Sequence, residues 1–93
     1  MTLYQAIKES INAQVRAFVM MQGGEVLPTA KENKLTLNLF GQQEEHEVLA
    51  LRTTDNGVVV VETINEGERY DDNLLHFSNE EMWQIIGLFL PRE

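Results

Sequence analysis

The sequence predicts an α+β fold in which one helix precedes and one helix follows an antiparallel sheet. Stretches with the helical spacing of apolar residues lie near both ends of the chain, and a capping-box pattern precedes each. Between them, apolar and polar residues alternate and are interrupted by glycine-containing turns, as in half-buried strands. The simplest arrangement is a four- to five-stranded meander with both helices on one face, forming one domain over residues 1–93.

The first helix is expected over residues 3–22. Thr2 and Gln5 form its capping box, and Gly23 with Gly24 ends it. Its apolar stripe consists of Tyr4, Ile7, Ile11, Val15, Phe18 and Val19. The segment 17–21, AFVMM, is apolar around nearly the whole circumference, which predicts burial on more than one side. In so small a domain this favours a homodimer packed through a helix or a sheet edge.

The central hairpin is expected to join strands 45–53 and 58–64 through Asp55-Asn56-Gly57. A three-residue loop with a glycine bulge pairs Leu51 with Val61 and Thr53 with Val59. That register places Leu49 on the same face as the alternating row Leu35, Leu37 and Leu39. A two-residue Asn-Gly loop shifts the pairing by one and turns Val58 and Val60 to that face instead. The bulged loop is preferred because it places more apolar area inward.

Shorter elements flank this hairpin. Residues 34–40, KLTLNLF, form a strand, Gly41-Gln42-Gln43 forms a turn, and Val26 with Leu27 forms a short strand that Pro28 confines to an edge.

Glu66-Gly67 closes a second hairpin, with residues 68–70 as its return strand. Residues 74–77 either extend that strand or lead into the last helix. Ser78 and Glu81 form the second capping box, for a helix over residues 79–90 that Pro91 stops.

The composition excludes several classes of function. The chain has 93 residues, a net charge of −8 and no cysteine, so disulfides and thiolate chemistry are excluded. Lys and Arg do not cluster, which argues against direct binding of nucleic acid or of an anionic membrane surface. The chain has neither a signal-peptide pattern at its start nor an apolar run long enough for a membrane span, so we expect a cytoplasmic protein.

The His46-Glu47 pair resembles the start of a zinc-hydrolase motif and fails as one. The His-Glu-x-x-His pattern needs a second histidine four residues on, and Ala50 stands there. A metal or small-ligand site built from His46, His76 and nearby carboxylates is an alternative, but nothing in the sequence brings the two histidines together. The plainer interpretation is two surface or half-buried histidines. We expect no resident cofactor or metal.

Catalytic motifs are equally scarce. Ser10 lies mid-helix and Ser78 is a helix cap, and neither a nucleophile elbow nor a phosphate-binding glycine loop occurs. Asp71 and Asp72 are adjacent, so on a strand they point to opposite faces. We therefore expect a protein that is not an enzyme.

The acidic segment between residues 62 and 81 is the main candidate surface for a partner. It contains Glu62, Glu66, Glu68, Asp71, Asp72, Glu80 and Glu81, against the single base Arg69. Such a surface steers a basic protein toward it, or serves only solubility. Trp83 lies at the border of the last helix's apolar stripe, either as a core residue or as a partner anchor.

The function expected is therefore a small acidic interaction module that binds another, basic protein. The candidate partner-binding residues are Glu66, Glu68, Asp71, Asp72, Glu80, Glu81 and Trp83. The alternatives are the ligand-binding domain described above and a structural homodimeric subunit.

Overall fold

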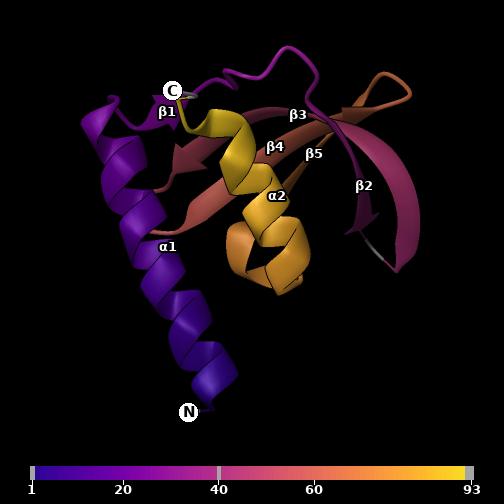
Figure 1. Ribbon diagram of the computed structural model, residues 1–93. Helices are drawn as coiled ribbons and strands as arrows, with labels where there is room; N and C mark the ends of the chain where they lie inside the picture. The colour runs from indigo at the N-terminus through magenta and orange to yellow at the C-terminus, as the bar shows by residue number, and fades with distance from the viewer. Residues whose placement is uncertain (1, 40, 92–93) are drawn as a thin grey trace.

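The computed structural model describes residues 2–39 and 41–91 and confirms the predicted α+β class. In chain order it contains α1 (Leu3–Met21), β1 (Glu25–Val26), β2 (Lys34–Leu39), β3 (Gln42–Thr53), β4 (Val59–Asn65), β5 (Glu68–Asn73), a 3₁₀ helix η1 (Leu74–His76) and α2 (Asn79–Phe89). Both helices lie on one face of the sheet, and the N-terminal turns of α1 project beyond it (Figure 1). Phe40, the last residue of the predicted strand 34–40, lies outside the described residues.

The sheet is antiparallel throughout. Strands β2 to β5 form a meander, and β1 pairs with the end of β3 on the same side as β2, through Glu25–Arg52 and Val26–Leu51. β1 is therefore a short edge strand, as predicted, although it spans residues 25–26 rather than 26–27. β3 already begins at Gln42, so the prediction that Gln42 and Gln43 are turn residues is wrong. Gln42 pairs with Leu39, which lengthens the ladder between β2 and β3.

The register of the central hairpin is the one expected from a bulged loop. Leu51 pairs with Val61 and Thr53 with Val59, and Gly57 takes a φ of 79°. The expectation that Leu49 lies on the buried face is wrong. A β-bulge lies between Val48 and Ala50, and Leu49 has no partner in the ladder. The extra residue reverses the alternation, so Val48 is buried in its place.

The segment after the second hairpin follows the second of the two alternatives that the sequence left open, because residues 74–76 lead into α2 and do not extend β5. Glu66 and Gly67 form its turn, with φ values of 52° and 82°, and β5 continues to Asn73, three residues further than expected. Residues 74–76 form the 3₁₀ helix η1, whose first turn the Asn73 side chain caps. η1 and α1 are joined by Lys8, whose Nζ donates hydrogen bonds to the carbonyls of Leu75 and Phe77.

The core lies between the sheet and the two helices. α2 contributes five buried residues, Met82, Ile85, Ile86, Leu88 and Phe89. α1 contributes Ile11, Val15 and Val19. The strands and η1 contribute Leu37, Leu39, Val48, Leu51, Val59, Val61 and Leu74. The capping boxes predicted at Thr2 and Ser78 are both formed.

The opposite face of the sheet carries charged groups. Arg52 pairs with Asp71 at 3.0 Å, and Glu62 accepts a hydrogen bond from Arg69 at 2.8 Å. These four residues neutralise one another across β3, β4 and β5. Within the described part of the chain, neither α1 nor α2 is both long and apolar enough to cross a membrane.

Candidate functional site: an apolar groove between the two helices

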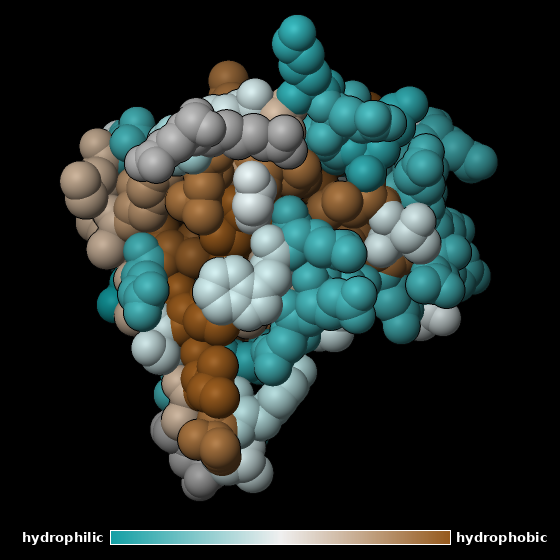
Figure 2. All heavy atoms as spheres, in the orientation of Figure 1, coloured by the Kyte–Doolittle hydropathy of each residue, from teal (hydrophilic) through white to brown (hydrophobic). Residues whose placement is uncertain are grey.

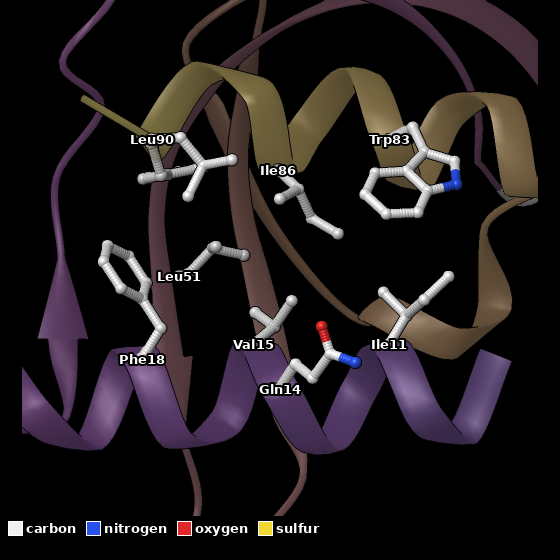
Figure 3. Close-up of a pocket in the computed structure, with 9 residues that line it drawn as sticks. Ile11, Gln14, Val15, Phe18, Leu51, Trp83, Ile86 and Leu90 are labelled. Atoms are coloured by element: carbon white, nitrogen blue, oxygen red, sulfur yellow. The ribbon is translucent and has the colours of Figure 1, made fainter. Parts of the chain in front are cut away.

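A groove of about 230 Å³ opens between α1 and α2. Ile11, Val15 and Phe18 line it from α1, with Gln14 at its edge, and Leu51 of β3 forms its floor. Trp83, Ile86, Phe89 and Leu90 line the opposite wall. Figure 3 shows Trp83 and Ile11 at one end, and Phe18 and Leu90 at the other. No charged residue lines the groove among the positions described, so what it fits is an apolar side chain.

The groove continues onto the exposed surface of α1. Figure 2 shows apolar residues running from the groove along α1 toward its projecting N-terminal end. Leu3, Tyr4 and Ile7 are exposed there, and Met20 and Met21 are exposed at the other end of the helix. These exposed apolar side chains are more than a scatter of single residues, because all of them lie on α1.

Trp83 is the residue of the site that the sequence singled out. Its side chain is 56% exposed, although neighbouring Met82 is fully buried. It therefore packs only part of its ring against the groove wall. A tryptophan in this position can gain apolar contact area from a partner at little cost in side-chain conformational entropy.

The charged residues of α1 point away from the groove. Lys8 donates a hydrogen bond to the Leu75 carbonyl of η1, and the Arg16 guanidinium donates to the Gly57 carbonyl at 3.3 Å in the β3–β4 turn. Both basic side chains thus hold α1 against the rest of the fold.

Several of the acidic candidates are engaged within the fold. Asp71 pairs with Arg52, and Asp72 lies 2.7 Å from the ring nitrogen Nδ1 of His76. Glu68 accepts a 2.9 Å hydrogen bond from the Tyr70 hydroxyl. That bond, with burial and the neighbouring carboxylates, raises the pKa of Tyr70, because each favours the neutral phenol.

Glu81 links α2 to the sheet. Its carboxylate accepts from the backbone N–H of Ser78 in the capping box and, at 2.7 Å, from the N–H of Asn38 in β2. Burial raises the pKa of Glu81, but the hydrogen bonds from Asn38 and Ser78 outweigh it, so the net shift is downward. This carboxylate is therefore part of the structure of the α2 N-terminus.

Glu66 and Glu80 differ from the other acidic candidates. Both are exposed, and neither carboxylate makes a hydrogen bond or ion pair with the residues that the structure describes. Glu66 lies in the β4–β5 turn, whereas Glu80 lies one turn before Trp83 and Gln84 on α2. Of the acidic candidates, Glu80 is thus the free carboxylate on the helix that carries Trp83.

His46 is a structural residue and is more buried than the sequence suggested. It is 2% exposed, its Nδ1 lies 3.1 Å from the Thr63 hydroxyl, and its Nε2 lies 3.6 Å from a Glu44 carboxylate oxygen. Tyr70 packs against the imidazole edge-on. His76 is exposed and faces Asp72. Within residues 2–39 and 41–91, no three His, Asp or Glu side chains are grouped so that they could hold a metal ion.

Comparisons with known proteins add no relative. The chain matches no protein-family model, no curated protein and no solved structure.

The groove itself was not predicted from the sequence. Trp83 was named as a candidate site residue, whereas Phe18 and Leu90 were predicted only as apolar residues of their helices and Gln14 was not singled out. The available signal was the segment AFVMM, which is more apolar than one buried helix face requires.

Proposed function

We propose that this chain is a protein-interaction module without catalytic activity, and that partner proteins dock in the α1–α2 groove. The observation that supports this most directly is the half-exposed Trp83 beside an open apolar groove. Tryptophan is enriched at the centres of binding interfaces, where it fills a pocket and excludes water. The groove provides the apolar walls that such an anchor needs, and α1 extends them by several turns.

The acidic surface has a secondary role in this proposal. Net charge of −8 attracts a basic partner over distances of about a Debye length, and contributes more to the rate of association than to the final affinity. Glu80, beside Trp83, and Glu66 are the free carboxylates that best suit this role. A charge on the partner next to its apolar contact would then lie against Glu80.

The test is affinity capture from lysate of the native organism with three baits. The first is the wild type, the second is Trp83→Ala, and the third combines Glu66→Lys with Glu80→Lys. We expect a set of proteins that the wild type retains and that Trp83→Ala loses. The third bait should retain the same proteins less well, and the difference should shrink at high salt. Leu27→Ala is the matched control, since Leu27 is exposed and apolar but does not line the groove.

A direct measurement follows from the composition. Trp83 is the single tryptophan, so intrinsic fluorescence reports on the groove alone. Binding of a captured partner should shift the emission of Trp83 to shorter wavelength, because its indole ring is then shielded from water. If Trp83→Ala retains every protein that the wild type retains, the groove is not the docking site and the proposal is wrong.

A further inference from the structure

The face of α1 next to the groove has the pattern of a helix–helix interface. Steps of four and three residues along this face give the α1 seam, which consists of Leu3, Ile7, Ser10, Gln14, Ala17 and Met21. All six residues are exposed. This spacing is the a/d heptad repeat by which two helices pack along their length.

Charge is absent from the seam and from both rows beside it. On the groove side the flanking row is Tyr4, Ile11 and Phe18, and on the other side it is Ala6, Ala13 and Met20. The three charged residues of α1, Lys8, Glu9 and Arg16, occupy the positions that a coiled coil turns to solvent. An exposed helix with no charge on more than half of its circumference is unusual in a chain of net charge −8.

We propose that the occupant of the groove and of the α1 seam is a second copy of this chain, packed with its α1 antiparallel to the first. This inference rests on the proposed docking role of the groove and gives its occupant in the isolated protein, which a basic partner protein would have to displace. The two copies are related by a two-fold axis, so each presents the same surface to the other.

The distribution of charge selects a second copy through α1 rather than through another surface. Residues 1–24 carry a net charge of +1, whereas residues 25–64 carry −4 and residues 65–93 carry −5. Contact through the β4–β5 turn, where Glu66 and Glu68 are exposed, would bring like charges together, which costs free energy. Contact through α1 keeps the acidic surfaces of the two copies apart.

The seam is self-complementary when the helices run in opposite directions. In one register, Leu3 of one copy packs against Met21 of the other, and Ile7 packs against Ala17. The central layer then places Ser10 against Gln14, a hydroxyl against an amide, twice across the axis. A polar layer of this kind fixes register and orientation, because any slip leaves the buried polar groups unpaired. Large residues thus meet at the ends and the polar pair meets at the centre.

The exposed area is close to that of a standard interface. Seven large side chains on the seam, its flanking rows and the groove are exposed by 45% to 82%: Leu3, Tyr4, Ile7, Met20, Met21, Trp83 and Leu90. At 56% exposure Trp83 offers roughly 100 Å², so seven such side chains offer on the order of 700 Å². A standard interface buries about 800 Å² per partner.

The first experiment measures mass against concentration for the full chain, by light scattering after size exclusion and by sedimentation equilibrium. We expect the mass to rise from 10.7 kDa to twice that value as the concentration increases. Gln14→Glu places two like charges in the central layer and should weaken the dimer at least about tenfold. Gln84→Glu is the matched control, since Gln84 is exposed on α2 and does not line the groove. Circular dichroism checks that both variants fold.

A second experiment tests the relative orientation of the two α1 helices. The chain has no cysteine, so Leu3→Cys with Met21→Cys introduces the only two thiols. Within one copy these positions lie roughly 27 Å apart along the helix, too far for a disulfide. Oxidation should therefore join two copies through two bonds. Leu3→Cys alone should not cross-link efficiently, because the antiparallel register separates the two Leu3 positions.

The outcomes separate this inference from the proposed function. A chain that stays at 10.7 kDa at every concentration overturns the dimer, while capture of other proteins through Trp83 still supports the docking role. A dimer that Gln14→Glu does not weaken, or efficient cross-linking of Leu3→Cys alone, overturns the α1 interface. A dimer through this uncharged seam should also not weaken as salt is added, unlike capture of a basic partner.

Discussion

The two helices lie side by side on the same sheet, yet they relate to the core in opposite ways. α2 buries five of its 11 residues, whereas α1 buries three of its 19. The apolar residues of α2 are thus almost all used in folding, apart from Trp83. α1 carries more apolar surface than the core can accept, and this excess lies beside the groove. The contrast teaches that α2 serves the fold, while much of α1 is available to bind something else.

The largest expected effect tests the folding role of α2. Phe89→Ala removes a ring that is 1% exposed and should lower the free energy of unfolding by about 3–5 kcal/mol. Thermal and denaturant unfolding would measure the loss. Leu3→Ala on α1 is the contrasting control, because its side chain is already in water. A comparable loss in Leu3→Ala at low protein concentration would contradict the distinction between the helices.

The two capping boxes allow the same comparison at the helix ends. Ser78→Ala should lower the free energy of unfolding by about 1 kcal/mol. The α2 N-terminus is also hydrogen-bonded to β2 through Glu81 and Asn38, so it cannot fray to compensate. Thr2→Ala should lower the free energy of unfolding by a smaller amount, because the first turns of α1 project into solvent and can fray. Chemical denaturation of the two variants in parallel would rank them. The reverse order would show that the N-terminal turns of α1 are held more firmly than their exposure indicates.

A smaller effect should appear as a dependence on pH. The pKa of Glu81 is lower in the folded protein than its ordinary value of 4.5, so its carboxylate stabilises the fold above pH 4.5. That contribution is lost as the pH falls below 4.5 through the lowered pKa of the folded state. Glu81→Gln should therefore be less stable than wild type near neutral pH. This gap in stability between variant and wild type should narrow in acid.

Melting temperatures measured from pH 7 to pH 3 would show whether the gap narrows. Glu80→Gln is the matched control, because it removes the same charge one residue away and breaks no hydrogen bond within the described structure. A gap of constant size across this range would mean that Glu81 acts on α2 through something other than its charge.

The smallest expected effect on folding is at Ile7. Ile7→Ala should change the free energy of unfolding of the dilute monomer by no more than about 0.5 kcal/mol, since the side chain is exposed on α1. The same variant should weaken self-association, because Ile7 lies on the α1 seam. Unfolding at two protein concentrations separates these results. A large loss in dilute protein would show that the projecting part of α1 is needed for folding.

Local patterns predicted most of the fold. The capping pairs at Thr2 and Ser78 fixed both helix starts within a residue, and Asp55-Asn56-Gly57 with the valines after it predicted the register of Leu51 and Val61. The bulge at Leu49 was not predictable, because a bulge is a response to the curvature of the whole sheet rather than to the residues in it. The sequence left residues 74–76 open between a strand and the approach to the last helix, because the short sequence LLH fits either, and their 3₁₀ conformation was not predicted.

The candidate site was predicted less well than the fold. Trp83 and the acidic residues stood out by composition, yet the structure uses Asp71, Asp72 and Glu81 in internal contacts that only the fold brings about. The groove depends on how far apart α1 and α2 pack, which no local pattern encodes. The sequence showed that α1 has an excess of apolar residues. It did not show which face of the helix would remain exposed.

The walls of the groove come from residues 11–18 and residues 83–90, and this separation has a consequence during synthesis on the ribosome. The first wall is made early, and its apolar side chains have no opposite wall until more than sixty further residues have been added. During that interval the newly made α1 is a target for chaperones and for other nascent chains of its kind. A synonymous or sequence change that slows translation between residues 20 and 80 would lengthen the interval, and should lower the yield of soluble protein without changing the finished structure.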